Sequence, residues 1–421
     1  MFCGGRGTSG AGSGCERMQA PLPTGRIGRA LDAMNFLSAD VRNAFGPYIN
    51  LYLVAGRHWS PLDVGLIMTA SGVLGIAAQT PIGAGVDVTR AKRGAIVSTM
   101  AVMAACALVI YFEPFFWPML FATSLLALAG DVFVPAVAAL TLGLYPKRDL
   151  AWRLARNSAF DHAGNIAIAV VAGAIAFYAA QRSVFLLVPF FAALTGLATS
   201  SIPAAAIDHA RARDLTAKDE APADYGVLLR KPPLMILAFS AALFQFANAP
   251  LLPFVGQTFA LTYPQDATTL MSVCIVLAQG VMLPIAILAG RTADSWGRRP
   301  LFLIAFVALP LRCAMYAMSS NLYWLIGIEL LDGIAAGIFA ALMPLIIADI
   351  MNGTGRYNFA YGAVATAQGL GAALSAAFAG AVLTRFGYTI VYLTLGVFAF
   401  AALGVFALAM PETKPSSPEA A

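Results

Sequence analysis

The feature that most constrains this chain is a series of long apolar blocks that recurs along its 421 residues. Each block runs for about 20 residues or more, the length at which an α-helix crosses the hydrocarbon core of a bilayer. Only 11% of the residues are charged, whereas a soluble domain carries about 25%. Because a water-facing surface needs those charges, we expect most of the surface to face lipid.

The blocks predict an all-α, polytopic membrane protein with twelve transmembrane helices. Inside a bilayer every backbone polar group must be bonded within the chain, so spans of this length are helices. The expected helices cover residues 30–55, 61–86, 94–112, 117–145, 157–180, 183–203, 233–261, 267–292, 300–319, 322–349, 359–384 and 387–410.

The charges in the loops predict the orientation. Basic side chains gather on one side of the predicted membrane, and the other side has Arg57, Arg182 and Arg385. Such an excess marks the cytoplasmic side. We therefore expect a multi-pass protein of the plasma (inner) membrane with both termini in the cytoplasm. Residues 1–29 are interpreted as a disordered tail, and residues 412–421 as a second tail.

Composition argues against several other classes of protein. The net charge of +5 comes from short loops, so it indicates membrane topology and no nucleic-acid partner. The five cysteines suggest no disulfide framework, and the three histidines lack metal-ligand spacing. We expect a monomer in the lipid bilayer with no metal and no cofactor.

A polar segment at 204–232, interpreted as a cytoplasmic linker, divides the chain into two halves that look like a repeat. One six-helix bundle is expected over residues 30–203 and another over 233–411. Transporters built from two repeated bundles place the substrate between them, near the midplane. The matched landmarks, at offsets of 207, 203 and 201 residues, are Gly83 and Asp87 with Gly290 and Asp294, Pro47 with Pro250, and Asp131 with Asp332.

The loop after the eighth predicted helix carries the most specific motif. It runs from Gly290 through Asp294 and Gly297 to the basic pair Arg298 and Arg299. A Gly, three residues, an Asp, two residues, a Gly and two basic residues resemble the signature loop of the major facilitator superfamily. The resemblance implies a secondary active transporter with two six-helix bundles around a central cavity.

A looser first copy of the motif follows the second predicted helix. It contains Gly83, Asp87 and Arg93, and Arg90 stands where the family usually has a glycine. In both loops, arginines can pair with an acid at an adjacent helix end. We expect Arg298 to pair with Asp349, and Arg93 with Asp149. Such a cluster can hold one conformation and release it in another. The alternative is that the basic residues only anchor the loops at the cytoplasmic face.

Ionisable side chains inside the predicted spans are candidates for function, because charges in a membrane are costly. The resemblance implies that the first, fourth, seventh and tenth helices line the central cavity. The proton-coupling and cavity candidates on these helices are Asp40, Arg42, Asn43, Asp131, Gln245, Asn248, Glu329 and Asp332. Glu329 and Asp332 are three residues apart and so share one helix face. The alternative is that such charges form structural ion pairs between helices.

Three other intramembrane side chains have predicted environments. Asp161 is the expected partner of Arg42. His162 is interpreted as an interfacial histidine near the cytoplasmic end of its helix. Arg312 is expected to form an inter-helix pair or to extend toward the outer face.

The sequence predicts a proton-coupled transporter of a small organic solute that works by alternating access. Asp131 is the predicted coupling residue, because a carboxylate near mid-membrane can gain a proton in one conformation and lose it in the other. Apolar and aromatic candidates near the cavity favour efflux, although the fifth helix lacks the proline typical of exporters in this superfamily. Proton-linked uptake, an integral membrane enzyme and a transporter-like receptor are the alternatives, and no catalytic motif supports the enzyme.

Overall fold

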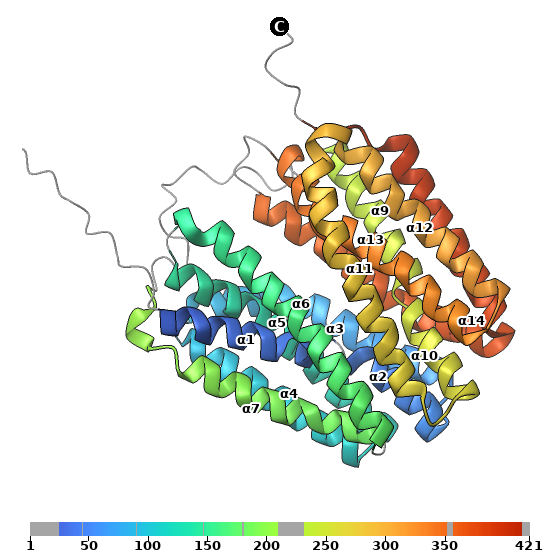
Figure 1. Ribbon diagram of the computed structural model, residues 1–421, viewed down its shortest axis with the longest axis horizontal. Helices are drawn as coiled ribbons and strands as arrows, with labels where there is room; N and C mark the ends of the chain where they lie inside the picture. Colours follow the sequence, from blue (N-terminus) through green and yellow to red (C-terminus); the bar gives the residue numbers. More distant parts are fainter. Residues whose placement is uncertain are drawn as a thin grey trace, which may run out of the picture.

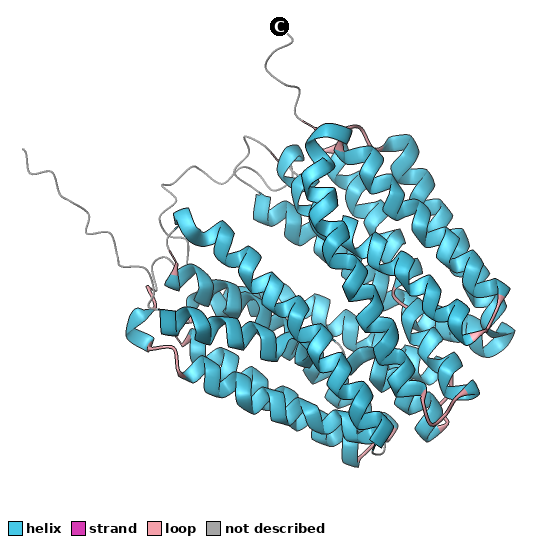
Figure 2. Ribbon diagram, in the orientation of Figure 1, coloured by secondary structure: helices cyan, strands magenta, loops and turns pink. Residues whose placement is uncertain are grey.

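A computed structural model describes residues 25–43, 45–89, 91–145, 147–178, 181–208, 231–351 and 357–414. All regular structure in these ranges is helical (Figure 2), which confirms the all-α prediction. Ten helical stretches of this part of the chain are long and apolar enough to cross a membrane. Residues 1–24 and 415–421, which make up most of the predicted tails at 1–29 and 412–421, and residues 209–230 of the predicted linker lie outside the described residues.

The described residues form two groups of helices. The N-half, residues 25–208, contains α1 (Gly25–Asn43), α2 (Phe45–Leu51), η1 (Tyr52–Gly56), α3 (Pro61–Val88), α4 (Lys92–Phe112), α5 (Phe116–Leu144), α6 (Lys147–Tyr178), η2 (Gln181–Leu186), α7 (Leu187–Ser200) and η3 (Ala204–Ala206). The C-half, residues 231–351 and 357–414, contains α9 (Pro232–Asn248), α10 (Leu251–Thr262), α11 (Ala267–Trp296), α12 (Arg298–Met318), α13 (Leu322–Ile350) and α14 (Tyr357–Ala409).

These elements account for the twelve predicted spans. The first span is divided among α1, α2 and η1, and the seventh is broken between α9 and α10 next to Pro250, whose ring removes a backbone donor. Helix α14 joins the last two spans across Gly387, which has φ +82°. Two predicted bounds are wrong: α1 begins at Gly25, inside the expected tail, and α6 begins at Lys147, ten residues before the expected 157 (157 − 147).

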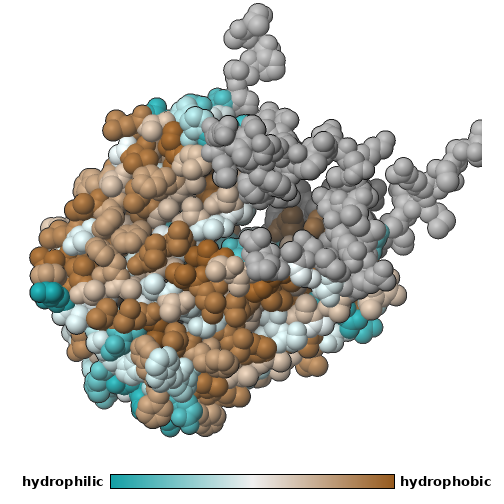
Figure 3. All heavy atoms as spheres, turned by 180° about the vertical axis from the view of Figure 1, so that it is seen from behind, coloured by the Kyte–Doolittle hydropathy of each residue, from teal (hydrophilic) through white to brown (hydrophobic). Residues whose placement is uncertain are grey.

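Each half has its own apolar core. One cluster of buried residues runs from Ile27 to Ile207 and also includes Met271, and the other runs from Leu234 to Met410 and also includes Leu51. Figure 1 shows the blue-to-green N-half beside the yellow-to-red C-half. Large apolar side chains such as Phe121, Leu197 and Leu408 are exposed, and hydrophobic residues cover most of the described surface in Figure 3. Such a surface fits a lipid environment.

The helix lengths give the repeat offset. Helices α4 and α12 both have 21 residues, and α5 and α13 both have 29. The starts differ by 206 in both pairs (298 − 92 and 322 − 116). At this offset Asp131 matches Gly337, and Asp332 matches Leu126. The predicted equivalence of Asp131 and Asp332 is therefore wrong by five residues, more than one helical turn.

Packing between helices agrees with the offset of 206. In the N-half, a Cβ on Gly75 of α3 would lie 3.2 Å from the Cβ of Ala127 in α5. In the C-half, a Cβ on Gly333 of α13 would lie 2.8 Å from the Cβ of Val281 in α11. Gly75 matches Val281 and Ala127 matches Gly333 at this offset, so the two helix pairs meet at the same level.

Contacts between the halves gather toward one end. Thr69 Oγ1 donates to Ala373 O at 2.6 Å, Thr269 Oγ1 donates to Gly173 O at 3.0 Å, and the hydroxyls of Tyr48 and Ser272 are 2.8 Å apart. These positions lie in the first halves of α3 and α11, late in α6 and in α2. Toward the C-terminus the two groups of helices diverge (Figure 1). The halves are thus joined at the end away from that terminus.

Candidate functional site

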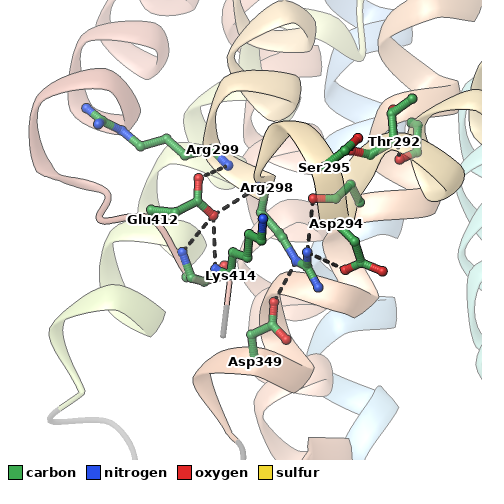
Figure 4. A network of polar contacts seen from close by, with 11 residues as sticks. Thr292, Asp294, Ser295, Arg298, Arg299, Asp349, Glu412 and Lys414 are labelled. Carbon is green, nitrogen blue, oxygen red and sulfur yellow. Dashed lines mark hydrogen bonds and ion pairs between the residues drawn. The ribbon is translucent and has the colours of Figure 1, made fainter. Parts of the chain in front are cut away.

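The signature loop of the C-half forms a charged cluster in which three helices meet (Figure 4). Gly297, between α11 and α12, has φ +92°, a conformation that glycine adopts without strain. The turn buries the Arg298 side chain, whose Nη1 is 2.7 Å from Asp294 Oδ1 and whose Nε donates to Asp349 Oδ2 at 2.9 Å. The expected pairing of Arg298 with Asp349 is confirmed. One guanidinium therefore connects the ends of α11 and α13 to the start of α12.

The chain beyond the last helix completes this cluster. The Glu412 carboxylate accepts the backbone N–H groups of Arg298 at 2.9 Å and Arg299 at 3.1 Å. The first N–H groups of a helix have no partner within it, and a negative charge there is favourable. Burial would raise the pKa of Glu412, but backbone N–H groups of Lys414, Arg298, Arg299 and Thr413 hold this pKa below its ordinary value. The predicted tail therefore begins with an ordered helix cap.

Arg312 organises a second cluster, in the interior of the C-half. Its Nη1 lies 2.5 Å from Asp332 Oδ1 and donates to Asn248 Oδ1 at 2.7 Å. Its Nη2 lies 3.6 Å from Glu329 Oε2, and Tyr316 donates to Glu329 Oε1 at 2.6 Å. The side chains of Arg312 and Glu329 are 1% and 0% exposed, and that of Asp332 is 22% exposed. The predicted inter-helix pair of Arg312 is confirmed, and both carboxylates that share a face of α13 reach it.

Two cavities meet at this cluster. The central cavity, of about 360 Å³, lies between the halves and is lined by Asn50, Pro61, Gly65 and Met68 from the N-half and by Asn248, Pro250, Gln257, Arg312, Asp332 and Ser375 among others from the C-half. A second cavity of about 280 Å³ is lined by Gln245, Asn248, Asp332 and residues of α13 and α14. Three predicted cavity residues, Gln245, Asn248 and Asp332, line one or both of these cavities. Glu329 is fully buried and is not among the described lining residues of either cavity.

Asp131 lies elsewhere. It lines a cavity of about 510 Å³, the N-half cavity, whose described lining residues all belong to the N-half. Its carboxylate is close to α3, because a Cβ on Gly75 would be 3.3 Å from Asp131 Oδ2. The prediction that Asp131 faces the cavity between the halves is therefore wrong. The error has the same origin as the wrong repeat offset, since five residues turn a helix to a different face.

The sequence of this two-halved helical protein matches known proteins along most of its length. The model of the family described as Major Facilitator Superfamily matches residues 31–291 and 234–421. The chain belongs to the major facilitator superfamily. This transporter is 42% identical over 398 residues to an uncharacterized MFS-type transporter of Mycobacterium tuberculosis. The match covers 93% of this chain and 94% of the relative. It is therefore a multi-pass membrane transporter and not an enzyme.

More distant relatives share part of the sequence or only the fold. The multi-drug resistance efflux pump PmrA of Streptococcus pneumoniae is 30% identical over 113 residues, 27% of this transporter and 28% of the pump. A point mutant of the nucleoside transporter NupG has a TM-score of 0.76 at 14% identity and covers 91% of this chain and 100% of its own. A D-xylose–proton symporter has a TM-score of 0.70 at 14% identity, covering 93% and 98%.

The first copy of the signature loop in this transporter differs from the second. Gly83 and Asp87 lie on α3, but the Asp87 side chain is outside the described residues. Lys92 matches Arg298 at the offset of 206, is buried, and donates to Val86 O. Arg93 Nη2 donates to Ser200 O at 2.8 Å, and its pairing with Asp149 remains a prediction.

A charge cluster of the N-half was missed by the sequence analysis. Asp32 of α1 is 2.7 Å from Arg153 and 2.8 Å from Arg156 of α6, and Arg153 Nε donates to Asn157 at 2.8 Å. Both arginines precede residue 157, the predicted start of the span, and so belong to a predicted cytoplasmic loop. Their spacing of three residues, which places side chains on one helix face, was the available signal.

The remaining predicted side chains have mixed outcomes. His162 lies midway along α6, and its Nδ1 is 3.2 Å from Gln279 Oε1 of α11. The interpretation as an interfacial histidine is therefore wrong, because His162 bridges the two halves. Asp40, Arg42 and Asn43 lie at the end of α1, and their side chains are outside the described residues. The pairing of Arg42 with Asp161 remains a prediction.

Proposed function

We propose that this transporter exports a small organic solute across the plasma membrane in exchange for protons, by alternating access. The observation that carries the proposal is the ion pair of Arg312 with Asp332 in the wall of the central cavity. Cavities of about 300–1,000 Å³ are typical of small-molecule sites, and the central cavity falls in this range. The partial similarity to PmrA, a multi-drug resistance efflux pump, supports the outward direction.

The charge balance of the Arg312 cluster supports proton coupling. One guanidinium lies beside two carboxylates, so the cluster has a formal charge of −1 when both carboxylates are ionised. A net charge in the membrane interior is costly, and one bound proton removes it. Asp332 fits the role of proton carrier better than the predicted Asp131, because it is partly exposed and lines the cavity between the halves.

The contacts between the halves support an inward-open state. The halves are joined in the first parts of α3 and α11, the end that the basic-loop asymmetry assigns to the outside. Alternating access would separate these contacts and bring the other helix ends together.

The orientation has a direct test. In a variant with its five cysteines replaced by alanine, Ser60→Cys should react with a membrane-impermeant maleimide on intact cells. Thr216→Cys, in the segment between the halves, should react only after the cells are opened. Labelling of Thr216→Cys from outside would overturn both the topology and the inward-open assignment.

The coupling proposal is tested with Asp332→Asn in proteoliposomes. A thermal-stabilisation screen first finds a substrate, because a ligand that binds the folded state raises apparent stability. Asn resembles the protonated carboxyl, so Asp332→Asn should retain substrate exchange and lose at least tenfold of the accumulation driven by a pH gradient. Asp131→Asn is the matched control. Normal gradient-driven accumulation by Asp332→Asn would remove this residue from coupling. If the unmodified protein moves the substrate in the same direction as the protons, the transport is uptake and the export proposal is wrong.

A further inference from the structure

The N-half cavity lies where the C-half holds its charge cluster. At the offset of 206, Arg312 matches Cys106, Tyr316 matches Ile110, Glu329 matches Thr123 and Asp332 matches Leu126. Ile110, Thr123 and Leu126 all line the N-half cavity, as does Ala107 next to Cys106. Mostly apolar side chains, smaller at three of the four positions, thus replace a guanidinium, a phenol and two carboxylates. The space that these groups fill in the C-half is a cavity of about 510 Å³ in the N-half.

The polar atoms of this cavity are hydrogen-bond acceptors. Ser71 Oγ donates its hydrogen to Ile67 O at 2.7 Å, and Thr123 Oγ1 donates its hydrogen to Met119 O at 2.8 Å. Both oxygens keep lone pairs but have no hydrogen left to give. Asp131 Oδ2 is buried and accepts no hydrogen bond from the described part of the chain. A ligand that satisfies these atoms must therefore be a donor.

The remaining lining indicates the rest of the ligand. Buried side chains including Val41, Met103, Ile110 and Phe185 surround the space. Among the described residues that line it, Asp131 is the charged one. An ionised carboxylate in such surroundings is costly unless a cation pairs with it. The lining matches a compact apolar body that carries one positive charge.

We infer that the N-half cavity binds a protonated organic amine. The ammonium group lies against Asp131, with Ser71 and Thr123 as further acceptors, and the apolar body lies among Met103, Ile110 and Phe185. Met68 lines both this site and the central cavity, but the described polar side chains of the two sites are different, and amine binding does not require the proposed transport cycle. Arg42 follows the lining residue Val41 in the sequence, and its side chain is outside the described residues; it is tested below as a competing cation.

Equilibrium binding tests this site on the full-length purified protein in lipid nanodiscs. The probe is 1-adamantylamine, and 1-adamantanol is a neutral ligand with the same apolar body. We expect the amine to bind at least tenfold more tightly than the alcohol, and Asp131→Asn to remove this preference. Asp332→Asn, a matched carboxylate change in the central cavity, should leave amine affinity within twofold.

Two further variants keep the test decisive if Asp131→Asn folds poorly. Ala107→Phe fills the N-half cavity while it retains the carboxylate, and should abolish binding of both ligands. Thr123→Val removes one acceptor and should weaken the amine severalfold while it spares the alcohol. Equal binding of amine and alcohol would overturn the inference. So would amine binding that appears only in Arg42→Gln, because Arg42 would then be the internal partner of Asp131.

Discussion

Arg312 is the residue on which the polar interior of the C-half depends. Its guanidinium lies between Asp332 and Glu329 and is almost completely buried. Removing one partner of a buried ion pair costs about 3–5 kcal/mol, because the other charge stays in the interior without compensation. We therefore expect Arg312→Gln to reduce the yield of folded protein sharply and to lower the Tm of what remains, measured by a thermal-unfolding assay in detergent.

If an uncompensated buried charge causes this loss of stability, removal of one carboxylate should restore part of it. Arg312→Gln combined with Glu329→Gln removes one charge of each sign and leaves Asp332 near the cavity, where it is partly exposed. The double variant should recover a large part of the lost Tm, although Glu329→Gln alone should be destabilising. A double variant no more stable than Arg312→Gln would show that packing of the guanidinium matters more than its charge.

Individual contacts were predictable from the sequence where a motif fixed the register. The pair of Arg298 and Asp349 followed from the glycine and arginine spacing of the loop. Asp131 could not be placed in the same way, because an error of five residues in the repeat offset turns its side chain to another face of α5. The partners of Arg312 were also not predictable, since hydropathy gives the position of a residue along a helix but not the direction of its side chain.

Among the secondary-structure elements, α12 is stabilised by a residue from beyond the last helix. Glu412 accepts the N–H groups of Arg298 and Arg299 at the start of α12. Its pKa is held below the ordinary value of about 4.3, so the carboxylate adds stability above that value. This contribution is lost as the pH falls through the lowered pKa.

Glu412→Gln should accordingly lower the Tm at pH 7 by about 1–2 °C. The effect is small because Glu412 is exposed to solvent. The difference from the unmodified protein should shrink as the pH is lowered below about 4. Glu113→Gln, at an exposed carboxylate in the loop between α4 and α5, is the control and should show no such pattern. A Tm difference that does not change with pH would indicate that the charge of Glu412 does not stabilise α12.

The bounds of α6 show why element ends were harder to predict than element positions. Apolar composition marks the part of a helix that lipid surrounds, and the predicted start at 157 follows that boundary. The helix itself begins at Lys147, because Arg153 and Arg156 find a partner in Asp32 of α1. Hydropathy cannot detect a helical turn that charge pairing stabilises outside the apolar span.

On the scale of the whole molecule, twelve spans and two repeated halves were predictable because bilayer thickness and backbone bonding restrict the possible folds. The conformational state was not, since it depends on how the two halves meet. Here α3 and α14 approach so closely that the carbonyls of Ala376 and Pro61 leave no room for a Cβ on Gly65 or Gly380. Both glycines permit the contact that joins the halves at one end.

Gly380→Ala should therefore destabilise this state relative to the one open at the opposite end. A Cβ at this position would lie 2.5 Å from Pro61 O, and a destabilisation of about 1.4 kcal/mol changes the ratio of two states tenfold. Ser375→Cys, in a cysteine-free background, reports the change because Ser375 is fully buried and lines the central cavity. Its reaction with an impermeant maleimide on intact cells should accelerate about tenfold when Gly380→Ala is added.

Gly404→Ala, a change in the same helix with no atom within 4 Å of the added Cβ, should leave the rate unchanged. If Ser375→Cys reacts at the same rate with Gly380→Ala as with Gly404→Ala, the contact of α3 with α14 does not control opening. The contact of α6 with α11 would then be the one that keeps this end closed.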